Sequence, residues 1–157
     1  MMDAVIDALN AADVPAVRAM PSALLGPLSA PVTAVGLKSA RAEQEALFSY
    51  LGFTERDGTQ VPLYGKKLAQ EIFLQVGCPR HLGADRCLQE AETVMQVLLE
   101  GVNGVEIGKL LVGGCEYDQK ADLFTCTVSA ECEGFLYALA DSDETEFTDF
   151  ILKGEAI

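Results

Sequence analysis

The sequence predicts an α+β fold: an antiparallel or mixed sheet, with one main helix packed on its apolar face and a short helix near the N-terminus. Two patterns lead to this prediction. Residues 123–139 alternate between apolar and polar side chains, which is the period of a strand with one buried face. Residues 84–100 place apolar side chains at helical spacing, from Cys87 to Leu98, opposite Asp85 and Glu92.

Length and composition describe one globular domain. The chain has 157 residues, of which 50% are hydrophobic and 22% charged, so we expect a single domain over residues 1–157. The chain contains 11 Lys and Arg and 24 Asp and Glu, which gives a net charge of −13. Such a chain repels phosphate backbones, so we expect no specific nucleic-acid binding.

The N-terminal part predicts short elements around a projecting region. Residues 3–12 read as a helix with Asp3 as its N-cap, and Pro15 ends it. The region 14–62, which follows, includes the parts that we expect to project from the domain. It contains a short strand at 16–20, an exposed Pro-rich arm or loop at 21–31, a strand at 32–39, and a stretch at 41–51 whose pattern fits a helix or a strand. Residues 55–58 read as a turn in which Gly58 supplies a positive φ, inside a hairpin or projecting loop.

The C-terminal half gives a clearer order of elements. Before the helix we expect a half-buried strand at 68–78 and a loop at 78–83. After the helix we expect a strand at 105–117, bent at Gly113 and Gly114, and a turn at 118–121 that leads to the long strand. An acidic loop at 141–146 and a last strand at 147–153 follow. Gly101 is the expected stop of the helix.

No segment reads as a membrane span or a signal peptide. The longest stretch without charge, residues 19–37, is interrupted by Pro21, Pro27 and Pro31. The N-terminus lacks a basic start followed by an unbroken apolar run, so we expect a protein of the cytosol. Its five cysteines, an odd number, then read as free buried thiols.

Candidate chemistry is sparse. His81, the one histidine, follows Cys78 at Cys-x-x-His spacing, but a structural zinc needs four ligands and no second cluster lies at ligand spacing. Asp141 and Asp143 imitate the start of a calcium loop that lacks its glycine and its final glutamate. Motifs for nucleotide binding and ester hydrolysis are missing. We expect no catalytic residue, no metal, no cofactor, and therefore no enzyme.

The layout resembles a known family. The segments that carry the resemblance are residues 34–39, 64–67, 72–76, 84–100, 123–137 and 147–154. Together they are similar to the tail-terminator (tail-completion) proteins, minor tail proteins of long-tailed bacteriophages and prophages. The resemblance implies a small sheet with flanking helices. It also implies a homo-oligomeric ring, commonly a hexamer, that caps the tail tube and faces the head–tail connector protein.

This family would place the chain in the bacterial cytoplasm during assembly and then in the virion tail, with no catalytic residues. The candidate contact residues for a ring or a partner are Leu24, Leu25, Pro27, Leu28, Glu55, Arg56 and Asp57. Acidic side chains lining the ring would keep DNA from sticking to its wall. The alternative is a cytosolic, non-enzymatic binding or adaptor module of the same fold class with an unknown ligand.

Overall fold

The computed structural model describes residues 1–19, 28–43, 50–56 and 58–139. Within them the chain is a mixed α+β protein dominated by strands, with two α-helices and one six-stranded sheet. The elements in order are α1 (Met2–Ala11), β1 (Ala16–Arg18), β2 (Val32–Glu43), β3 (Tyr50–Arg56), β4 (Thr59–Pro79), the 3-10 helix η3 (Arg80–Leu82), α2 (Gly83–Glu100), β5 (Glu106–Asp118) and β6 (Leu123–Leu139). No described helix is long and apolar enough to span a membrane.

The sheet is organised around β4. Its strand order is β1-β2-β4-β6-β5, and β3 pairs with the first part of β4. The β1–β2 pair is parallel and the others are antiparallel, so the sheet is mixed. β4 and β6 pair without a break from Leu63 opposite Leu139 to Pro79 opposite Leu123.

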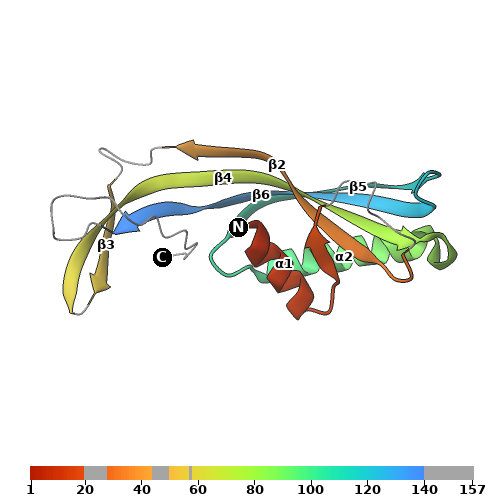
Figure 1. Cartoon of the computed structure of the whole chain (residues 1–157), viewed down its shortest axis with the longest axis horizontal. Helices are drawn as coiled ribbons and strands as arrows, with labels where there is room; N and C mark the ends of the chain where they lie inside the picture. The colour runs from red at the N-terminus through yellow and green to blue at the C-terminus, as the bar shows by residue number, and fades with distance from the viewer. Residues whose placement is uncertain (20–27, 44–49, 57, 140–157) are drawn as a thin grey trace.

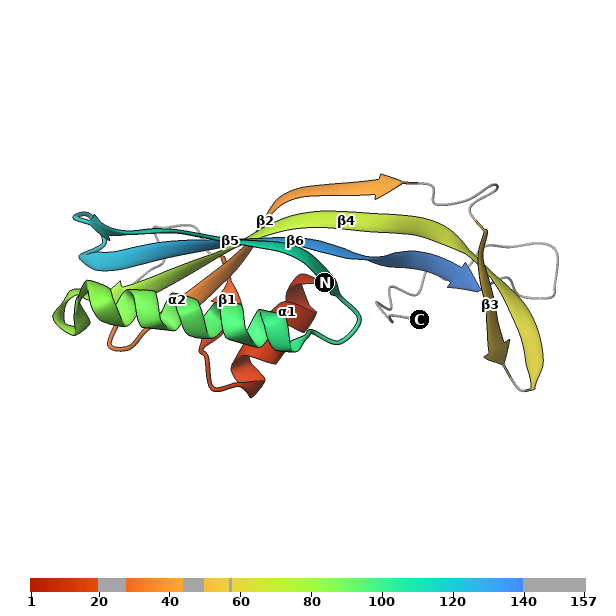
Figure 2. The ribbon, with the colours of Figure 1, turned by 180° about the vertical axis from the view of Figure 1, so that it is seen from behind.

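One part of the molecule, which we call the body, contains the hydrophobic core. It comprises residues 1–19, 28–38 and 71–132. Ile72, Leu74 and Val76 of β4 are fully buried there, in one cluster with side chains of α1, α2, β2 and β6. Figure 2 shows α2 running along one side of the sheet, with α1 beside it. The alternation of β4 and β6 and the helical spacing of α2 together place these apolar side chains in one volume.

The other part, which we call the arm, extends beyond both helices (Figure 1). It comprises β3 and residues 39–43, 58–70 and 133–139 of the sheet. None of its described side chains belongs to the core cluster. β4 has 21 residues and, at about 3.3 Å each, measures roughly 70 Å, so one strand runs through both parts.

The structure confirms several expected elements. α2 lies where the helical spacing predicts it, and Gly101 beyond its end has φ 106°. The predicted bend in β5 is a register shift between Val112 and Cys115. β3 and β4 form the hairpin, in which Gly58 has φ 76°.

Other expectations need correction. Asp3 is not an N-cap, because α1 begins one residue earlier and the Asp3 carboxylate instead accepts hydrogen bonds from Arg18. Glu55 and Arg56 belong to β3 rather than to the turn. Residues 41–43 and 50–51 are strand, while 44–49 lie outside the described residues, as do Met20, the acidic loop 141–146 and the strand at 147–153.

β4 also begins at Thr59, well before the predicted 68. Pro62, Gly65 and two lysines weaken the strand signal of this first part. Pairing with both β3 and β6 nevertheless holds it extended.

Candidate functional site

The two faces of the arm differ in chemistry. Side chains alternate along β4, so Tyr64, Lys66, Leu68 and Gln70 share the face of the buried Ile72. The register adds Ala40 and Ala42 of β2 and Gly134 and Leu136 of β6 to this face, which we call the arm underside. Among the described residues from Pro62 to Gln70 of β4 and their strand partners on this face, Lys66 is the only charged one. Glu55 lies at the outer end of the underside, opposite Gln60.

Three aromatic rings form a cluster on the underside, at the β3–β4 hairpin. Tyr50 lies edge-on to Phe53, with ring centroids 5.5 Å apart, and to Tyr64 at 5.7 Å. Phe53 is 60% exposed and Tyr64 40% exposed. Aromatic rings that pack on one another yet stay open to solvent are typical of interaction surfaces.

The opposite face of the arm carries ion pairs near the body and the buried Leu63 further out. Lys67 contacts Glu133 at 2.8 Å and Arg41 contacts Glu43 at 2.9 Å. Glu131, the neighbouring carboxylate on β6, lies 3.8 Å from Lys109. Glu131 and Glu133 therefore take part in surface ion pairs, which contribute little stability and suit a solvated face.

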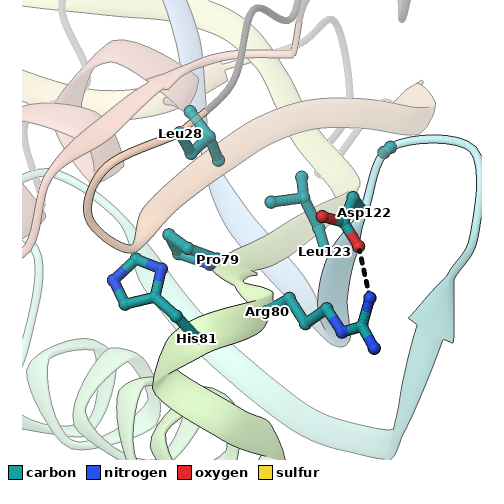
Figure 3. Close-up of a pocket in the computed structure, with 7 residues that line it drawn as sticks. Leu28, Pro79, Arg80, His81, Asp122 and Leu123 are labelled. Carbon is teal, nitrogen blue, oxygen red and sulfur yellow. Dashed lines mark ion pairs between the residues drawn. The ribbon is translucent and has the colours of Figure 1, made fainter.

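A hollow of about 440 Å³ lies at the other end of β4. Figure 3 shows Pro79, Arg80 and His81 on one side of it, with Leu123 and Asp122 across from them. Arg80 is 3.8 Å from Asp122. Its guanidinium also lies 5.7 Å from the centre of the Tyr117 ring. The cation of the hollow is therefore already engaged by a carboxylate and a ring.

The Tyr117 hydroxyl donates a hydrogen bond to Asp122, and this contact raises the pKa of Tyr117. Tyr117 stays neutral at physiological pH, so it adds no charge to the hollow.

His81 and Cys78 do not form a metal site. His81 is exposed at the hollow, whereas Cys78 is fully buried in the core. The described residues contain no group of three or more His, Cys, Asp or Glu side chains that could hold a metal ion.

The buried thiols are held in their protonated form. The Cys87 Sγ donates to the carbonyl oxygens of Phe124, at 3.5 Å, and of Val76, at 3.7 Å. Burial raises the pKa of Cys78, Cys87 and Cys132, in the last case to about 11. Because the thiolate is the nucleophile, these cysteines are unreactive at neutral pH.

The contact residues expected from the sequence lie in two places. Leu28 is half-buried and lines the hollow, where its Cδ1 lies close to the Gly77 backbone. Glu55 and Arg56 are exposed in the hairpin. Leu24, Leu25, Pro27 and Asp57 lie outside the described residues. Sequence reasoning missed Phe53 and Tyr64, because their neighbourhood depends on the strand pairing of a segment that the pattern left undecided.

Comparison with known proteins adds no relative. The chain matches no protein-family model, and no curated protein shows significant similarity to it.

Proposed function

We propose that this chain is a structural assembly protein that works by binding copies of itself in a ring. The ring would act as the tail terminators do, capping a phage tail tube and joining it to the head–tail connector. The observation that carries the proposal is the apolar arm underside, which continues the buried face of the sheet beyond the helices.

Exposure of this face favours self-association. In the body, the same face of β4 is fully buried at Ile72, Leu74 and Val76. We propose that α2 packs on the apolar face of the body, which leaves the underside open to a neighbour. Contiguous apolar surface of this kind marks interaction sites, because covering it removes apolar area from water.

The edges of β5 and β2 are less suited to the contact. The uncharged part of the β5 edge, with Leu111 55% exposed, is distorted by register shifts at Ile107/Lys109 and Val112/Cys115. The free end of β2 carries Lys38, Arg41 and Glu43. Bulges and charges are the devices that discourage edge-to-edge pairing, so we propose that the contact uses a face rather than these two edges.

Mass and shape in solution test this function. Sedimentation velocity and negative-stain electron microscopy of the full chain should give a closed particle whose mass is a small multiple, six in the implied ring, of 16.8 kDa. The particle should dissociate on dilution. A chain that stays monomeric up to millimolar concentration would contradict the proposal and favour the adaptor module, with the hollow at Arg80 as its binding site.

A further inference from the structure

The outer surface of α2 carries a second apolar row. The inner row, which includes Ala91, Val94 and Leu98, is buried in the core. Leu88, Met95 and Leu99 form the outer row, in which Leu88 is 38% and Leu99 72% exposed while Met95 packs partly against the core. Together with Glu92, these positions follow spacings of four, three and four residues, so they lie along one line of the helix. The core covers Met95 in part, whereas Leu88 and Leu99 are open to solvent among the described residues.

We propose that the arm underside of one copy docks on this outer row of α2 in a second copy. The inference rests on the proposed self-assembly and names its two surfaces. It joins Phe53, Tyr64 and Leu68 of one chain to Leu88 and Leu99 of the next.

Charge complementarity selects this occupant. Lys66 is the charged side chain of the described underside between Pro62 and Gln70, whereas the described body carries six basic and thirteen acidic side chains. Glu92 lies within the outer row and Asp85 beside it, and Lys66 lies on the underside. The lysine of the underside is attracted to the acidic helix, whereas two undersides would bring their lysines together.

The area of the contact fits a ring better than a dimer. Nine residues at about 3.3 Å and three strands at about 4.8 Å give an underside on the order of 400 Å². This is about half of what each partner contributes to a standard interface, so one contact is weak. Two different surfaces form a heterologous contact, and when its rotation closes it gives a ring in which every copy makes two such contacts.

Two pairs of variants test the surfaces by sedimentation velocity. Ala42→Asp places a charge on the underside, and its control Ser39→Asp places one on the opposite face of the same strand. Leu99→Asp changes the outer row, and Thr93→Asp changes another exposed side of α2. All four positions are exposed, so the fold is kept. We expect Ala42→Asp and Leu99→Asp to weaken self-association at least about tenfold, and each control to change it less than about twofold.

A charge exchange tests the pairing itself. Lys66→Glu and Glu92→Lys should each weaken association, and the double variant should recover most of it. Loss of association with Ala42→Asp but not with Leu99→Asp would overturn the inference in favour of arm-to-arm packing. Association insensitive to both would overturn it while leaving self-assembly in place. A monomeric wild-type chain would instead overturn the proposed function.

Discussion

The body and the arm are built from the same strands but reach different states. Leu74 in the body is fully buried, whereas Leu68, six residues earlier on the same face of β4, is half-buried. Two helices lie beside the sheet in the body and none lies beside the described arm (Figures 1 and 2). Alternation therefore sets which face a side chain takes, and the presence of a neighbouring element sets whether that face is buried in a core or open to solvent.

The largest contrast is expected from the same truncation in the two parts. Leu74→Ala leaves a cavity in a packed core and should lower the free energy of unfolding by about 2–5 kcal/mol. Leu68→Ala should cost about 1 kcal/mol or less. Urea unfolding at a concentration where the chain is monomeric measures both. Equal losses of unfolding free energy would show that the arm has a hydrophobic core of its own.

A smaller loss of stability is expected from a substitution at Gly36 of β2, which lies opposite Phe73 of β4. A Cβ at Gly36 would lie 2.2 Å from Cζ of Phe73, so the ring would have to move. Gly36→Ala should destabilise the body by about 1–3 kcal/mol. In a chain that already carries Phe73→Ala, the same change should cost much less, because the clash is gone. An undiminished cost in that background would locate the strain elsewhere.

The body should also lose stability in alkali. Burial raises the pKa of Cys132 from 9.0 to about 11, so above pH 9 the unfolded chain releases this proton first. The free energy of unfolding should thus fall as the pH rises between those values. Urea titrations across this range measure the slope, and Cys132→Ala should reduce it. An unchanged slope in the variant would assign the effect to other groups.

The smallest effect is expected from the ion pair that joins α1 to β1. Arg18 lowers the pKa of Asp3, so any contribution is present at neutral pH and lost as the pH falls below the ordinary value of 3.8. Both side chains are mostly exposed, and Asp3→Asn should therefore change urea unfolding little. A large loss would show that the pair holds α1 against the body.

The sequence predicted the body better than the arm. In α2 and in the later parts of β4 and β6, helical or strand periodicity coincides with burial, so the pattern is sufficient. In the arm, Pro62 and Gly65 weaken the signal, and the cluster of Tyr50, Phe53 and Tyr64 exists only through the β3–β4 register. No local pattern contains that register, so this aromatic cluster could not be predicted.

Hydroxyl-radical footprinting of dilute and concentrated protein tests most directly whether the arm underside is an interface. Oxidation of Phe53 and Tyr64 should fall several-fold as the oligomer forms, while Leu111, exposed on β5, stays equally reactive. Unchanged oxidation of Phe53 and Tyr64 in an oligomer would show that the assembly uses another surface.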